Sequence, residues 1–301
     1  MWGFYGLFSA VFLGVYDVIR KKVLNNNPVI PVLFLASLTG ALIFLPFILF
    51  SQTGVIKEAS LFYLPSGDFY LHRLAFYKSV LVGVSWFLAY NALSRLPLTI
   101  MVPIRSTGPM WTLIGALILY GERFSPAQWA GIITVLGFFY YFTLAGRKEG
   151  IHFFQNKWIF AAIGATLVGS VSSLYDKYLF SNYDRLFIQA WYSIYMIPVL
   201  LPFVLVAWYP RRRSDAVFSW NFYIHLIGIF LVISDFLYFY ALSLEGSSIA
   251  LLSILRRSSV IISFISGAVF FGERNLKHKG LALIGILLGV VLIILGTVIG
   301  Q

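Results

Sequence analysis

Cysteine is absent from the 301-residue sequence, and only 11% of its residues are charged. Without cysteine there is no disulfide, no thiolate metal ligand and no thiol nucleophile. The four histidines lack metal-ligand spacing such as HExxH; they are His72, His152, His225 and His278. Neither a GxSG motif nor a Walker-type GxxxxGKS or GxxxxGKT motif occurs. We therefore predict no enzymatic activity, no catalytic residues, no metal and no nucleotide-binding partner.

Apolar residues, by contrast, make up 60% of the sequence, and its mean hydropathy is +0.87. An ordinary soluble domain carries about 25% charged residues. This composition predicts an integral membrane protein whose partner is the lipid bilayer. The net charge of +11 fits an anionic cytoplasmic leaflet, so no nucleic acid partner is needed to explain it.

Ten windows of about 20 apolar residues have the length that crosses about 30 Å of hydrocarbon. They cover approximately residues 2–22, 29–50, 75–95, 98–120, 126–145, 158–179, 186–208, 222–244, 248–271 and 279–299. The longest connector, residues 51–74, is too short for a further soluble domain. The predicted fold is therefore an all-α membrane protein with ten transmembrane helices.

Short matches recur in the same order in the two halves of the chain. Gly14, Lys22, Leu24 and Asn27 recur as Gly169, Lys177, Leu179 and Asn182; Leu45, Pro46 and Phe47 recur as Leu201, Pro202 and Phe203; Gly121, Glu122 and Arg123 recur as Gly272, Glu273 and Arg274. The matches predict two five-helix repeats, residues 1–146 and 147–301. Because five is odd, the second repeat enters the membrane in the opposite orientation, an arrangement typical of secondary transporters with a substrate site between the repeats.

Two segments carry a family resemblance: LYGERFSPAQWAGIITVLG and FFGERNLKHKGLALIGILLG, each following one predicted span and opening the next. With YFYAL before the ninth span, they resemble the EamA type of the drug/metabolite transporter superfamily over essentially the whole chain. The resemblance implies a carrier of small metabolites, without a cofactor, in the inner (cytoplasmic) membrane. It also implies a cavity lined by the first, third, fourth, sixth, eighth and ninth spans. The paired Gly-Glu-Arg motifs are expected to be structural, as helix-end caps with local ion pairs.

Charge in the connectors predicts the orientation. Charges near the end of a span are counted with the adjoining connector. On this count, connectors after odd-numbered spans hold 13 Lys and Arg, including Arg20, Lys21 and Lys279, and those after even-numbered spans hold 6, including Lys78. The positive-inside rule then places both termini outside the cytoplasm. The resemblance implies termini inside, so both orientations stay open.

Three arginines fall within the predicted spans: Arg105, Arg256 and Arg257. An arginine at the bilayer centre costs about 2.5 to 3.5 kcal/mol, so each needs a partner or water. Arg105 and Arg256 are repeat equivalents, 151 residues apart like the Gly-Glu-Arg motifs. We predict that both bind an anionic group of the substrate and that Arg257, facing about 100° away, has a structural partner. Snorkelling to the near interface is the alternative.

Acidic residues within the spans are candidates for charge pairing or coupling. Asp235 lies deepest in its span and is predicted to bind substrate or to neutralise the arginines when the site is empty. Asp17 is predicted to pair with a charge or to take part in coupling. A permanent salt bridge between the eighth and ninth spans is the alternative for Asp235.

Polar and aromatic residues on the same spans complete the predicted site: Trp86, Tyr90, Asn91, Tyr238, Tyr16 and Tyr175. The predicted function is secondary transport by alternating access, most simply export of an amino acid or organic acid, by a monomer or homodimer. The first alternative is a carrier of phosphorylated or other purely anionic metabolites. A membrane enzyme or a channel is the second.

Overall fold

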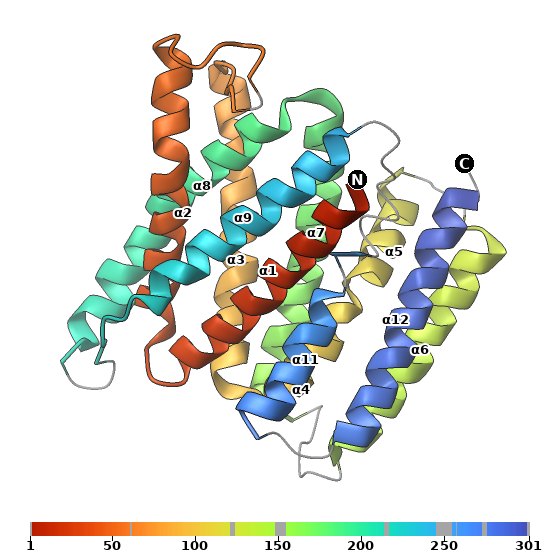
Figure 1. The fold of residues 1–301 in the computed structure, drawn as a ribbon. Helices are drawn as coiled ribbons and strands as arrows, with labels where there is room; N and C mark the ends of the chain where they lie inside the picture. The colour runs from red at the N-terminus through yellow and green to blue at the C-terminus, as the bar shows by residue number, and fades with distance from the viewer. Residues whose placement is uncertain are drawn as a thin grey trace.

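A computed structural model describes residues 2–60, 62–120, 124–147, 155–213, 217–244, 255–256, 258–272 and 276–299, and every regular element in these ranges is helical. The helices are α1 Trp2–Leu24, α2 Val29–Gln52, α3 Phe69–Arg95, α4 Leu98–Ser106, α5 Gly108–Tyr120, α6 Pro126–Arg147, α7 Lys157–Asn182, α8 Arg185–Phe203, α9 Tyr223–Ser243, α11 Ser259–Phe270 and α12 Leu276–Ile299. A π-helical turn, Val204–Trp208, extends α8. The predicted all-α membrane fold of two five-helix repeats is confirmed (Figure 1).

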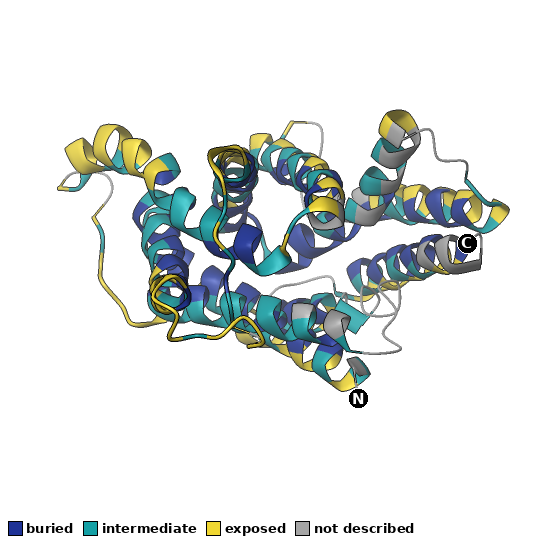
Figure 2. Ribbon diagram, turned by 90° about the horizontal axis from the view of Figure 1, so that it is seen from above, coloured by how far each residue is buried: buried dark blue, intermediate teal, exposed yellow. Residues whose placement is uncertain are grey.

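Among the described residues, five segments are long and apolar enough to cross a membrane by length and composition: Gly3–Leu24, Val29–Gln52, Lys157–Asp176, Arg185–Arg211 and Leu276–Ile293. The surface agrees, because many large hydrophobic residues are exposed, and the exposed residues lie on the outer faces of the helices (Figure 2). On α12 the exposed residues Leu281, Ile284, Leu288, Leu292 and Leu295 recur every three or four positions. Such a stripe on an outer helix is the side that lipid covers.

Two differences from the predicted spans stand out in the first half of the chain. α3 begins six residues before its span, where the side chain of Asp68 caps the helix by accepting a hydrogen bond from the amide of Leu71 (2.8 Å). The predicted span 98–120 is broken at Thr107 into α4 and α5. Pro109 has no amide hydrogen for the carbonyl of Arg105, and the hydroxyl of Thr107 donates to the carbonyl of Ile104 (2.8 Å).

Packing joins each helix of the first half to one of the second. α1 packs on α9 and α3 on α7, while α2 packs on α8, α4 on α11 and α6 on α12. In the repeat, α7 is the equivalent of α1 and α9 the equivalent of α3, so exchanging the two halves turns the α1–α9 pair into the α7–α3 pair. The other three pairs each join equivalent helices and stay the same, as expected for a pseudo-twofold axis. Between α1 and α9, Ser9 and Ser234 each donate a hydrogen bond to the carbonyl of the other (2.7 and 2.9 Å).

Glycines allow α6 and α12 to lie in backbone contact (Figure 1). A Cβ atom at Gly131 would lie 2.7 Å from the carbonyl oxygen of Gly289 and 2.8 Å from the amide nitrogen of Ile293. We expect Gly131→Ala to cost about 1 to 3 kcal/mol in stability, because backbone atoms cannot give way as a flexible side chain does. The measurement is thermal unfolding of the detergent-solubilised protein.

Gly137, on the same helix, provides the matched control. A Cβ atom there meets nothing within 4 Å. Gly137→Ala should leave the unfolding temperature unchanged or raise it, because alanine favours a helix over glycine by about 1 kcal/mol. Equal effects of the two substitutions would contradict close packing at Gly131.

Candidate functional site

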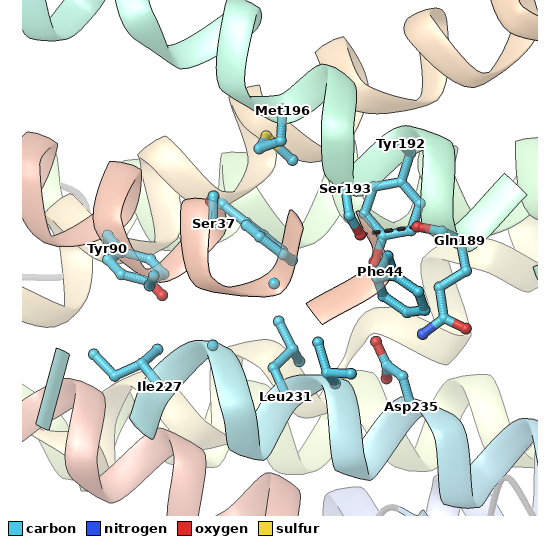
Figure 3. Close-up of a pocket in the computed structure, with 15 residues that line it drawn as sticks. Ser37, Phe44, Tyr90, Gln189, Tyr192, Ser193, Met196, Ile227, Leu231 and Asp235 are labelled. Atoms are coloured by element: carbon cyan, nitrogen blue, oxygen red, sulfur yellow. Dashed lines mark hydrogen bonds between the residues drawn. The ribbon is translucent and has the colours of Figure 1, made fainter. Parts of the chain in front are cut away.

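A cavity lies between α2 and α3 of the first half and α8 and α9 of the second (Figure 3). Its polar lining residues are Ser37, Tyr90, Gln189, Tyr192, Ser193 and Asp235, and its larger apolar ones are Phe44, Trp86, Met196, Ile227, Leu231 and Val232. The lining is mostly apolar with a few polar groups, which is the composition of an organic-ligand site.

The cavity lies on the pseudo-twofold axis. Ser37 and Ser193 are 156 residues apart, the separation that also relates Leu45 to Leu201. Trp86 and Asp235 are 149 residues apart, the separation that also relates Ala92–Ser94 to the identical segment Ala241–Ser243. Equivalent positions of the two halves therefore line the same cavity; the first pair carries the same hydroxyl, whereas in the second an indole corresponds to a carboxylate.

Two buried polar atoms in the cavity have no hydrogen-bond partner in the described part of the chain: Oγ of Ser37 and Oε1 of Gln189. The two residues are only 7% and 3% exposed. Helical hydroxyls elsewhere bond to the preceding turn; Thr39 on α2 donates to the carbonyl of Leu35 (2.8 Å). A buried polar group left unsatisfied costs about 1 to 3 kcal/mol. Its presence in a cavity points to a ligand or water that supplies the missing bond.

One end of the cavity carries an ion pair. Asp235 lines the cavity and accepts a hydrogen bond from the guanidinium of Arg256, whose Cζ lies 4.6 Å from the centroid of the Tyr238 ring. Each partner is partly buried. The pair is nearly neutral overall, so it offers opposite charges to a solute while little net charge is buried.

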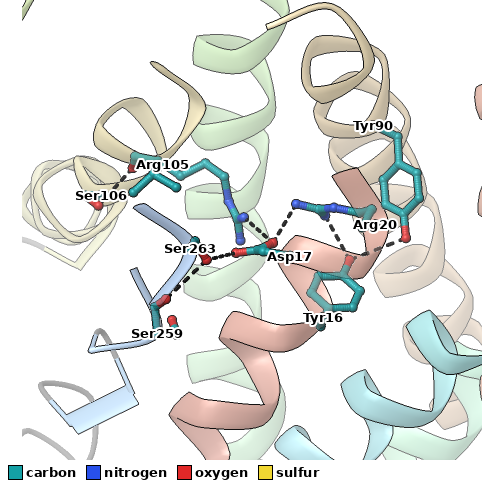
Figure 4. A network of polar contacts seen from close by, with 9 residues as sticks. Tyr16, Asp17, Arg20, Tyr90, Arg105, Ser106, Ser259 and Ser263 are labelled. Atoms are coloured by element: carbon teal, nitrogen blue, oxygen red, sulfur yellow. Dashed lines mark hydrogen bonds and ion pairs between the residues drawn. The ribbon is translucent and has the colours of Figure 1, made fainter. Parts of the chain in front are cut away.

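A second ion-pair network, centred on Asp17, lies beside the cavity (Figure 4). One carboxylate oxygen accepts from Arg20 (2.7 Å) and Arg105 (2.8 Å), and the other from Ser263 (3.1 Å). The network therefore joins α1 and α4 of the first half to α11 of the second. Because Asp17 carries only one negative charge, the two arginines give the cluster a net positive charge.

Tyrosines connect this network to the cavity. The guanidinium of Arg20 donates to Oη of Tyr16 (2.9 Å), whose hydroxyl is 3.4 Å from that of Tyr90. The guanidinium carbon of Arg20 also lies 4.7 Å and 4.9 Å from the centroids of these two rings. Tyr90 lines the cavity. A change at the cavity wall can thus reach the buried charges through direct contacts.

A third buried pair joins the halves beside the cavity, where Nζ of Lys78 lies 6.0 Å from the centroid of the Tyr192 ring. Lys78 on α3 donates to the carboxylate of Asp176 on α7 (2.5 Å) and to the hydroxyl of Ser172 (2.7 Å). The lysine is 6% exposed. Lys78 was predicted to be a connector charge, as were Arg20 and Lys21; these predictions are wrong, because all three are buried within α1 and α3. Lys78 and Lys21 bond to groups distant in the sequence, and Arg20 bonds to Tyr16 and Asp17 of its own helix. Lys279, likewise counted as a connector charge, is buried in α12 and donates to Thr99 (3.3 Å).

Among the residues predicted for the substrate site, Trp86, Tyr90 and Asp235 line the cavity. Asn91 donates instead to the carbonyl of Phe87 in its own helix (2.7 Å), and Tyr175 donates to the carbonyl of Leu74 (3.2 Å). Tyr16 belongs to the Asp17 network, and Tyr238 lies beneath Arg256.

The two arginines expected to share one anion are held separately. Arg105 pairs with Asp17 and Arg256 with Asp235, and neither lines the cavity. The two arginines therefore pair with different carboxylates and do not need a shared anion, although Asp17 also binds Arg20. Arg257 and the motif residues Gly121, Glu122, Arg123, Glu273 and Arg274 lie outside the described residues. Gly272 is described and has φ +60°, a conformation common just after a helix end.

The helices around the cavity also differ from those that the resemblance implied. Of the six implied, only the third and eighth spans, α3 and α9, line it; α2 and α8 form the rest. The reason is a close approach: a Cβ atom at Gly228 of α9 would lie 2.4 Å from the carbonyl oxygen of Ala36 on α2. Ser37 and Gln189 were therefore missed, although the match of Ser37 to Ser193 across the repeat was a readable signal.

Comparison with known proteins adds a family and a fold. The family model described as "EamA-like transporter family" matches residues 1–144 and 156–295. No curated protein matches the sequence. A solved structure described as "Crystal structure of protein" is similar, with a TM-score of 0.64 and 15% identity over 97% of this chain and 94% of that chain. At that identity the likeness shows a shared fold alone.

Proposed function

The chain belongs to the EamA-like transporter family, and from this premise we propose that it moves a small organic metabolite by alternating access around the cavity between α2, α3, α8 and α9. Members of this family are membrane transporters rather than enzymes. The observation that carries the proposal is the cavity on the pseudo-twofold axis, lined equally by two helices of each half. Inverted-repeat transporters bind substrate at such an interface.

An amino acid is the proposed substrate class. The Asp235–Arg256 pair offers a carboxylate to an ammonium group and a guanidinium to a carboxylate. The ammonium group of a zwitterion can therefore take the place of Arg256 beside Asp235, and its carboxylate the place of Asp235 beside Arg256. Among the residues known to line the cavity, one is acidic and none is basic. That balance argues against the alternative of phosphorylated or purely anionic metabolites, which would bring negative charge toward Asp235.

The Asp17 network is proposed to couple the halves. When one half rocks against the other, Ser263 on α11 and Asp17 on α1 must either separate or move together. The break between α4 and α5 lies close to Arg105, where a helix can bend without losing further backbone hydrogen bonds. We propose export across the cytoplasmic membrane as the direction, since efflux down a metabolite gradient needs no coupling ion.

Purified protein in lipid vesicles tests this proposal. We expect saturable counterflow: vesicles loaded with an unlabelled amino acid should accumulate the labelled one transiently, because a carrier exchanges bound solute between its two faces. The measurement uses a panel of amino acids and, in parallel, sugar phosphates. Uptake of sugar phosphates alone would favour the anionic alternative. Conductance without saturation would indicate a channel, and chemical conversion of the solute would indicate an enzyme.

A further inference from the structure

The two unsatisfied atoms in the cavity lie at different levels along it. Gly228 of α9 faces the backbone of Ala36 and Gly40 on α2, which places Ser37 at the level of Gly228. Asp235 follows Gly228 by seven residues, about 10 Å at 1.5 Å per residue. Figure 3 shows Gln189 beside Asp235 at one end of the cavity, and Ser37 farther along, toward Tyr90.

Both atoms are poorly explained as parts of the scaffold. Replacing Oγ of Ser37 or Oε1 of Gln189 by an apolar group removes no hydrogen bond that the described structure makes. Other buried groups of the same types do support the fold: Oε1 of Gln128 accepts from the amide of Ser125 (2.7 Å), and Oγ of Ser51 on α2 accepts from the amide of Leu64 (3.0 Å). Ser37 and Gln189 thus retain bonding capacity for a solute.

The chemistry of each end differs. Figure 3 shows the amide nitrogen of Gln189 directed toward Asp235 and Oε1 directed away from it. Oε1 and the Asp235 carboxylate are both acceptors at this end of the cavity, and acceptors suit an ammonium group. The hydroxyl of Ser37 can donate or accept, and no carboxylate lines that level of the cavity among the residues described. It therefore suits an uncharged polar group. Between the two ends the wall carries the apolar side chains of Leu231 and Met196, which can pack against methylene groups of a solute.

From this arrangement we propose that Gln189 and Ser37 determine specificity: Gln189 binds the amino group of an amino acid beside Asp235, and Ser37 binds a polar, uncharged group at the end of its side chain. The proposal rests on the transport function proposed above and narrows its substrate to one class. Asp235 and Ser37 lie at levels about 10 Å apart along α9, and an amino acid whose side chain ends in a polar group likewise carries two separated polar ends.

Three probes of similar length separate the two contacts. Glutamine carries both polar ends, norleucine lacks the terminal amide, and hexanoate lacks the amino group as well. We expect the wild-type protein to bind glutamine most tightly, norleucine less tightly and hexanoate least, as measured by thermal stabilisation over a concentration series. A site built to hydrogen-bond a group discriminates against the analogue that lacks it.

Two variants separate the residues. Gln189→Leu should weaken both amino acids about 10- to 100-fold, because a hydrogen bond to a charged group is lost. Ser37→Ala should weaken glutamine about 3- to 10-fold and leave norleucine unchanged, because a hydrogen bond between neutral groups is lost. In the absence of solute, both variants should unfold at the wild-type temperature or above it, since each removes an unsatisfied polar atom.

Matched controls give the opposite signature. Gln128→Leu and Ser51→Ala should lower the unfolding temperature and leave affinity for the probes unchanged, because Gln128 and Ser51 are equally buried but bonded within the protein. If the wild-type protein binds glutamine and norleucine with equal affinity but transports other amino acids, the proposed roles of Ser37 and Gln189 are wrong and the proposed transport function stands. Failure of every amino acid to bind or to be transported overturns the proposed substrate class with it. A lower unfolding temperature for empty Gln189→Leu overturns the claim that the residue is held free for solute.

Discussion

Asp235→Asn should reduce saturable amino-acid transport at least about 100-fold while the protein remains folded. The substitution keeps the size of the side chain and removes its charge, so the ammonium group of the solute loses a charge-assisted hydrogen bond and the Coulomb attraction around it. Together these contribute on the order of 3 kcal/mol, and every 1.4 kcal/mol is tenfold in affinity. Initial rates of counterflow in vesicles, at several solute concentrations, measure the loss.

The partner of Asp235 provides the control. Asp235 also holds Arg256, so the single variant alone does not separate a binding role from a structural one. The double variant Asp235→Asn/Arg256→Gln removes both charges and leaves no guanidinium without a counter-charge. If Asp235 serves only to neutralise Arg256, the double variant should recover transport. Persistent loss in a folded double variant supports binding of the ammonium group, and Asp235→Glu should retain part of the activity.

Asp17→Leu should destabilise the protein by about 3 to 5 kcal/mol, the range measured when one partner of a buried ion pair is removed. The side chain of Asp17 is 7% exposed and holds two guanidinium groups, those of Arg20 and Arg105. Without it, two positive charges face each other inside the membrane. We expect a lower yield of monodisperse protein and a lower unfolding temperature in detergent.

Neutralising the whole network should reverse the defect. In the triple variant Asp17→Leu/Arg20→Met/Arg105→Met no buried charge lacks a partner, and apolar replacement of buried ion networks is often neutral or stabilising. Recovery of the unfolding temperature is the expected result. Asp68→Ala, which removes only an N-cap at the start of α3, should cost about 1 kcal/mol. If Asp17→Leu costs no more than Asp68→Ala, the network does not hold the halves together.

Hydropathy predicted the spans because each must cross the same thickness of hydrocarbon. The count of connector charges failed for another reason: it treats every lysine and arginine near the end of a span as part of a connector. Arg20 pairs with Asp17 on its own helix, whereas Lys21 donates to the carbonyl of Leu93 and Lys78 to Asp176, both on other helices. When these three residues and Lys279 are removed from the count, connectors after odd-numbered spans still hold more positive charge than those after even-numbered spans. The predicted orientation therefore stays the same.

The site was predictable only in part. Asp235 drew attention as a charge in an apolar span, and Trp86 and Tyr90 as aromatic residues near charges. Ser37 and Gln189 carry no charge, and serine is common in membrane helices, so composition gave no reason to select them. What distinguishes them is a missing hydrogen bond, and a missing bond becomes visible only when every neighbour has been placed.

The pairing of each helix with one from the other half also has a consequence during synthesis. Lys78 bonds to Asp176, 98 residues later in the chain. At a synthesis rate of about 5 to 20 residues per second, its carboxylate partner leaves the ribosome about 5 to 20 seconds after the lysine itself. Through that interval the nascent first half holds an ammonium group that the finished protein buries, so we expect the insertion machinery to shield it until α7 arrives.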